Sequence, residues 1–74
     1  MGLAMRTTRY EFHRDGGVAW ALVFEPLSGL WHIEKSRPRG ACVRIALAEF
    51  EASEHGRQLR AQLAGAVREV EADA

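Results

Sequence analysis

The sequence contains little cysteine and little lysine, and it has no long apolar segment. Its single cysteine, Cys42, excludes an intramolecular disulfide and any zinc site built from several cysteines. Residues 18–24 form the longest apolar run, which is far shorter than the roughly 18 residues that cross a bilayer. We therefore expect a cytoplasmic protein that does not associate with membranes.

The chain also lacks a net charge, because ten Lys and Arg balance ten Asp and Glu. A balanced total is untypical of nucleic-acid-binding domains, which carry a basic excess. The balance hides an asymmetry, however. Residues 1–44 hold seven basic and four acidic side chains, a net charge of +3, whereas residues 45–74 hold three and six, a net charge of −3. We therefore expect positive charge on the N-terminal part and negative charge on the C-terminal part.

What the sequence does contain is typical of one small folded domain. Hydrophobic residues make up 47% of the 74 residues and charged residues 27%, which are ordinary values for a globular protein. A chain of this length buries about 62% of its extended surface on folding, which is enough for one core. We expect a flexible extension over residues 1–5 and a single domain over residues 6–74.

Between residues 6 and 47 apolar and polar side chains alternate, which is the period of a β-strand. We expect four strands joined by turns, at residues 6–14, 18–25, 30–35 and 41–47. One face of these strands carries the larger apolar side chains and is expected to form the core: Tyr10, Phe12, Trp20, Leu22, Phe24, Ile33, Val43 and Ile45. The other face is small and polar, with Arg9, His13, Ala19, Ala21, His32 and Arg44.

From residue 48 onward helix-forming residues dominate. One apolar stripe repeats there at helical spacing: Leu59, Leu63, Val67 and Val70. Gly56 indicates either a kink or the end of a short first helix, and Ser53 is suited to cap a second one. We therefore predict a two-layer α+β domain, in which a four-stranded antiparallel β-meander is followed by one long C-terminal helix.

The predicted helix is longer than the sheet beneath it. A helix over residues 48–72 would run about 37 Å, whereas strands of seven residues span only about 23 Å. Val67 and Val70 would then need a partner outside the domain. We expect this partner to be a second copy of the chain, with Ala61 and Gly65, four residues apart, allowing the two helices to approach closely.

The arginines of the predicted outer face, Arg9 and Arg44, together with Arg37 and Arg39 of the basic loop, suit contacts with phosphates. Trp31 would add a stacking platform for bases if it faced outward beside Arg44, and the alternation leaves its burial open. The alternative is that these charges form only the solvated face of a half-buried sheet.

The sequence shows no set of residues suited to catalysis or to metal binding. Soft metal ligands are limited to His13, His32, His55 and Cys42, and none lies at helical metal-site spacing from another. No combination of nucleophile, base and orienting group is visible. We therefore expect a protein without catalytic residues, metal site or cofactor.

The order of a β-meander and a long C-terminal helix resembles that of the positive-cofactor-four and Whirly-like single-stranded-DNA-binding proteins. Three segments carry the resemblance: Arg37-Pro38-Arg39-Gly40, Ile45-Ala46-Leu47 and Glu49-Phe50. The resemblance implies a dimer built through the C-terminal helices, and strand binding across the sheet with contacts at Arg37 and Arg39. Residues 40–47 are longer than the family's strand, and its strongly basic tail is missing.

Our leading hypothesis from the sequence is a small non-catalytic module that binds nucleic acid, with single-stranded DNA as the candidate ligand and the choice between DNA and RNA left open. The predicted contacts are Arg9, Arg37, Arg39, Arg44 and Trp31. The predicted homodimer interface is Ala61, Gly65, Val67 and Val70. The alternative is a small protein-interaction or adaptor domain that binds another protein and no nucleic acid.

Overall fold

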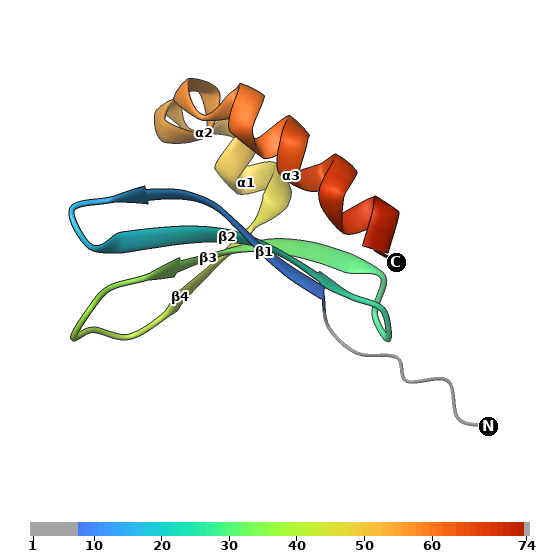
Figure 1. Cartoon of the computed structure of the whole chain (residues 1–74), viewed down its shortest axis with the longest axis horizontal. Helices are drawn as coiled ribbons and strands as arrows, with labels where there is room; N and C mark the ends of the chain where they lie inside the picture. Colours follow the sequence, from blue (N-terminus) through green and yellow to red (C-terminus); the bar gives the residue numbers. More distant parts are fainter. Residues whose placement is uncertain (1–7, 74) are drawn as a thin grey trace.

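Four strands form one antiparallel sheet in the computed structural model, which describes residues 8–73 (Figure 1). They follow one another in the sheet as in the chain: β1 (Thr8–Asp15), β2 (Val18–Glu25), β3 (Leu30–Ser36) and β4 (Val43–Ala46). Three helices follow and lie on one face of the sheet: α1 (Leu47–Ala52), α2 (Glu54–Gln58) and α3 (Arg60–Asp73). The predicted two-layer α+β fold is therefore confirmed, although the helical layer is not one long helix. The extension expected over residues 1–5 lies outside the described residues.

Alternation in the two central strands places side chains as predicted. Trp20, Leu22 and Ile33 point toward the helices and belong to the core cluster. Ala21 and Val23 point to the opposite side of β2, which we call the outer face of the sheet, and they are also buried. Both faces of β2 are therefore buried over residues 19–23.

Strand β1 departs from simple alternation because it contains a β-bulge. Glu11 lies opposite Ala21, but the next paired residue is His13, which lies opposite Trp20. Because Phe12 is the extra residue, each later side chain of β1 points to the face opposite to the one that strict alternation predicts. The imidazole of His13 consequently lies on the helical side, with its ring centroid 6.5 Å from that of His55. The prediction that His13 faces outward is therefore wrong.

Both edge strands are less buried than expected. Tyr10 on β1 is 41% exposed and Val43 on β4 is 45% exposed, although both were predicted to be core residues. Strand β4 is also shorter than the predicted segment of residues 41–47, because it starts at Val43 and α1 begins at Leu47. Helix α3 packs chiefly on β1 and β2, and the main helical contact of β3 and β4 is with the short helix α1. The apolar side of β4 is therefore incompletely covered.

The helical segment breaks at Ser53, where the predicted cap is confirmed. The hydroxyl of Ser53 accepts a hydrogen bond from the backbone N–H of Gly56 at 3.0 Å and donates one to the carbonyl oxygen of Phe50 at 2.6 Å. A Cβ atom added to Gly56 would lie 1.8 Å from that same carbonyl oxygen. The two short helices can therefore fold against each other only because residue 56 has no side chain.

Helix α3 fits over the sheet instead of extending past it. Val70 is only 1% exposed and belongs to the core, and Val67 is half-buried against the same cluster. The prediction that Val70 needs a partner outside the domain is therefore wrong, because the helical segment is interrupted at Ser53 and again at Leu59, so the helix that covers the sheet starts only at Arg60. Among residues 8–73, no helix combines the length and the apolar composition needed to cross a membrane.

We expect Gly56→Ala to destabilise the protein, although alanine normally favours a helix over glycine by about 1 kcal/mol. The added methyl group collides with backbone rather than with a movable side chain, so α1 and α2 must separate. We expect a loss of about 2–3 kcal/mol, equivalent to a fall of roughly 10 °C or more in Tm. Thermal unfolding followed by circular dichroism measures this.

Gly65→Ala provides the matched control. Gly65 also lies within a helix, and a Cβ atom there meets nothing within 4 Å. This variant should be as stable as the wild type or more stable by up to about 1 kcal/mol. Equal melting temperatures for the two variants would contradict the proposed role of Gly56.

Candidate functional site

The outer face of the sheet carries arginines, as predicted, but each lies beside a carboxylate. Arg9 Nε donates a hydrogen bond to Glu34 Oε1 at 3.0 Å, although Arg9 is on β1 and Glu34 is on β3. Ala21 of β2 lies in register with Glu34, and its small side chain leaves room for the arginine to cross the intervening strand. This pair neutralises one of the cations predicted to bind phosphate.

The remaining two arginines of the outer face also have acidic neighbours. Arg14 donates two hydrogen bonds to Glu11, at 3.0 and 3.1 Å, and both side chains are exposed. Arg44 Nη2 lies 3.8 Å from a carboxylate oxygen of Glu25, so this third pair is looser. The outer face therefore carries three arginines and three carboxylates, and its charges balance.

His32 lies buried between two of these carboxylates. Its Nδ1 is 4.0 Å from Glu25 Oε2, and its Nε2 is 3.8 Å from Glu34 Oε2. Nε2 has no hydrogen-bond partner among residues 8–73. The Arg9 hydrogen bond lowers the pKa of Glu34 below its usual value against the opposing effect of burial, and the charges of Arg9 and His32 lower it further. Glu34 is thus held as a carboxylate by its neighbours.

The small residues of the outer face are not exposed to solvent. Ala21 has no accessible surface, and Ala19 and Val23 are also buried. Ala21 lies between two charged residues in register, Glu11 and Glu34. The face therefore presents paired charges to the solvent instead of an open cationic groove.

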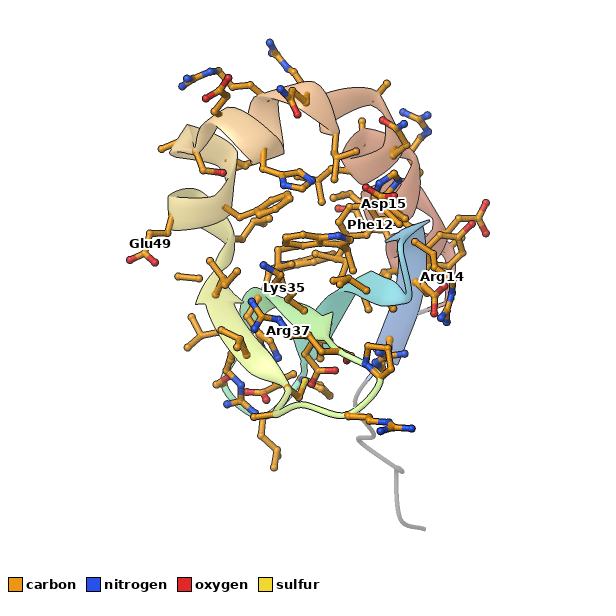
Figure 2. The ribbon with its side chains drawn as sticks, turned by 90° about the vertical axis from the view of Figure 1, so that its left-hand side faces the viewer. Phe12, Arg14, Asp15, Lys35, Arg37 and Glu49 are labelled. Atoms are coloured by element: carbon orange, nitrogen blue, oxygen red, sulfur yellow. The ribbon has the colours of Figure 1, made fainter. Side chains whose placement is uncertain are left out.

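Positive charge also gathers at one end of the sheet, in a segment that contains no Asp or Glu of its own. Residues 35–44, which we call the basic hairpin, comprise the end of β3, the following loop and the start of β4. They hold four cations, Lys35, Arg37, Arg39 and Arg44, and no Asp or Glu. Figure 2 shows Lys35 and Arg37 at this end of the molecule. Arg37 and Arg39 are exposed, and neither is within 4.0 Å of a carboxylate among residues 8–73.

The backbone and the neighbouring turn both support the loop of the basic hairpin. The N–H of Gly40 donates to the carbonyl of Arg37 at 3.4 Å, which closes a turn around Pro38. Pro38 packs against the turn between β1 and β2, where a Cβ atom on Gly17 would lie 2.9 Å from its ring. Gly17 has a φ of +84°, which suits glycine. These contacts hold Arg37 and Arg39 on either side of an anchored proline.

Lys35 and Trp31 occupy the helical side of the sheet. The Nζ of Lys35 lies 4.9 Å from the ring centroid of Trp20, a cation–π contact that the sequence analysis did not anticipate. Trp31 lies opposite Phe24 with ring centroids 4.9 Å apart and is half-buried. Trp31 therefore does not lie beside Arg44 on the outer face, as the stacking hypothesis required.

The predicted contact residues consequently do not form one surface. Arg9 and Arg44 lie on the outer face with acidic neighbours, whereas Arg37 and Arg39 lie in the loop of the basic hairpin. The acidic partners of these arginines were not predicted from the sequence. Alternation places Glu34 on the same face as His32, but no local signal indicates which cation Glu34 meets.

Residues suited to metal binding do not cluster in the part of the chain that the structure describes. No group of three or more His, Cys, Asp and Glu side chains is close enough there to hold an ion. The rings of His13 and His55 face each other, and the exposed Cys42 accepts a weak hydrogen bond from Ser36 at 3.6 Å. The two histidines and the cysteine belong to separate parts of the fold.

Comparisons of the chain with protein-family models, with curated proteins and with solved structures found no match. The resemblance to the positive-cofactor-four and Whirly-like proteins therefore stays a hypothesis. The function must be argued from the surface itself.

We expect the Arg9–Glu34 pair to make stability depend on pH. Because the pKa of Glu34 is lower in the folded chain than in the unfolded chain, its contribution is complete above the unfolded value and disappears as the pH falls through the folded value. Glu34→Gln keeps the shape but not the charge. It should cost about 0.5–1 kcal/mol at neutral pH, since the pair is partly exposed, and the loss of stability from about pH 5 to pH 3 should become shallower.

The measurement is urea unfolding across this pH range. Glu49→Gln is the control, because Glu49 projects away from α1 (Figure 2) and makes no salt bridge with another described residue. The Arg9–Glu34 assignment fails if both variants have the same pH profile.

Proposed function

We propose that this chain is a small non-catalytic module that binds single-stranded nucleic acid through the basic hairpin. The observation that carries the proposal is the charge of residues 35–44, which hold four cations and no carboxylate. Two of them, Arg37 and Arg39, are exposed on an anchored loop without an acidic neighbour within 4.0 Å among the described residues.

The chemistry of the guanidinium group supports phosphate as the ligand. Arginine binds phosphate oxygens through paired N–H donors, and its planar face stacks on bases. Each phosphate that is neutralised releases condensed counterions, so the affinity falls as salt increases. Arg37 and Arg39 offer these donors directly, because neither has a carboxylate within 4.0 Å in the part of the chain that the structure describes.

The paired charges favour the basic hairpin over the outer face as the contact. An approaching phosphate would compete with Glu34 for Arg9 and with Glu11 for Arg14. Arg44 is paired less tightly than Arg9 and Arg14, because its Nη2 lies 3.8 Å from the carboxylate of Glu25. We therefore assign the contact to Arg37 and Arg39, with Arg44 contributing at the margin.

A second candidate is a protein-interaction domain that binds no nucleic acid. The turn between β2 and β3 favours it, because Leu27 and Leu30 are 85% and 64% exposed there. Large exposed apolar side chains are typical of protein contacts when they gather in one place. This turn lies at the end of the sheet opposite the basic hairpin (Figure 1), so the two candidates use different surfaces.

The salt dependence of binding to a fluorescent oligo-dT tests the proposal. The logarithm of the affinity should fall linearly with the logarithm of the salt concentration, with a slope of about −0.7 per phosphate contacted. Arg37→Ala/Arg39→Ala should weaken binding about tenfold at low salt and reduce the slope by about 1.4, since two contacts are lost. Fluorescence anisotropy at a series of salt concentrations measures both quantities.

Two controls separate the basic hairpin from the rest of the surface. Arg68→Ala removes an exposed charge from α3, and Arg9→Ala removes a paired charge from the outer face. Both should change the slope by less than Arg39→Ala alone. An affinity that falls most with Arg9→Ala would return the contact to the outer face, and no binding at low salt would favour the protein-interaction domain.

A further inference from the structure

Helix α3 borders a groove that the proposed nucleic-acid contact does not use. The groove has a volume of about 410 Å³ and lies between α3 and the pair α1–α2. Its lining combines charged with small and apolar residues: Glu51, Gly56, Arg57, Arg60, Leu63, Ala64 and Val67. Helix α3 packs chiefly on β1 and β2, and the groove lies on the flank of the helix that faces α1 and α2.

One stripe of α3 runs along the edge of this groove. Arg60, Ala64, Val67 and Glu71 follow one another at intervals of four, three and four residues, which places them on one side of a helix. Arg60, Ala64 and Glu71 are exposed, and Val67 is half-buried. The stripe therefore has a cation at one end, small and apolar side chains in the middle and an anion at the other end.

Two copies of this stripe are complementary when they run antiparallel, because the cation end of one copy then meets the anion end of the other. In a two-fold symmetric contact, residue i of one copy meets residue j of the other, and j meets i. Two antiparallel copies of the stripe, centred between Ala64 and Val67, place Arg60 opposite the second copy's Glu71 at both ends. Ala64 then meets the second copy's Val67 in the middle. Neither Arg60 nor Glu71 has a salt-bridge partner among the described residues of its own chain.

We propose that the chain forms a two-fold homodimer in which the Arg60–Ala64–Val67–Glu71 stripe of α3 packs antiparallel on the same stripe of a second copy. This contact differs from the one predicted through Ala61 and Gly65. Gly65 lines the opposite groove, beside Tyr10 and Phe12 of β1, and the charged residues of that groove, Glu11 and Glu69, are both acidic. Two copies of that surface would repel each other.

Charge reversal tests the pairing directly. Arg60→Glu and Glu71→Arg each replace two attractive contacts per dimer with two repulsive ones, so each should weaken dimerisation at least tenfold. Arg60→Glu/Glu71→Arg restores complementarity in the reversed sense and should return the Kd to within about threefold of the wild type. Sedimentation velocity over a range of protein concentrations measures the Kd, and circular dichroism establishes that each variant is folded.

Arg68→Glu is the matched control, because it makes the same change of charge on α3 outside the stripe. It should leave the Kd unchanged within a factor of about two. A wild-type chain that stays monomeric at millimolar concentration overturns the proposal. So does a double variant that dimerises no better than either single variant. If Ala61→Arg abolishes dimerisation and Arg60→Glu does not, the dimer contact lies instead on the surface predicted through Ala61 and Gly65.

Discussion

The packing of two aromatic rings on Trp20 organises the whole helical layer. Phe50 and His55 lie with their ring centroids 5.8 and 4.4 Å from that of Trp20. In a continuous helix, side chains five residues apart would point about 140° away from each other around the axis. Both rings reach the same indole only because the helix breaks at Ser53. The break in turn requires a residue without a side chain at Gly56, where the backbone approaches the Phe50 carbonyl.

The break also determines how much of the sheet is covered. Since α1 and α2 occupy the space above Trp20, α3 starts again at Arg60 and runs over β1 and β2, where it buries Val70. A single helix starting at the end of β4 would have extended past the sheet. Two signals of the break, the cap at Ser53 and the glycine at 56, were readable in the sequence. Their consequence for Val70 was not, because it depends on the direction in which α3 returns.

The same limit applies to the strands and to the candidate site. Alternation identified the faces of β2 and β3 correctly, since a regular strand has a fixed period of two. It failed for His13, because a bulge at Phe12 adds one residue that no local pattern indicates. Alternation placed Arg9 and Glu34 on one face, but their contact also requires the register of three strands and the small side chain of Ala21 between them. A single sequence therefore does not predict which charged residues on non-adjacent strands pair with each other.

The distribution of charge connects the proposed nucleic-acid binding with the proposed homodimer. The arginines of the outer face lie beside carboxylates, whereas Arg37 and Arg39 of the basic hairpin have none within 4.0 Å among the described residues, and these two offer only a few phosphate contacts. A lone hairpin of this kind binds weakly at physiological salt. A homodimer carries two hairpins, and once the first is bound, the second meets the same strand at a high effective concentration. Tight binding by such a small chain would then require an oligonucleotide long enough to reach both hairpins, whereas a monomer would gain little from length beyond the few nucleotides that Arg37 and Arg39 contact.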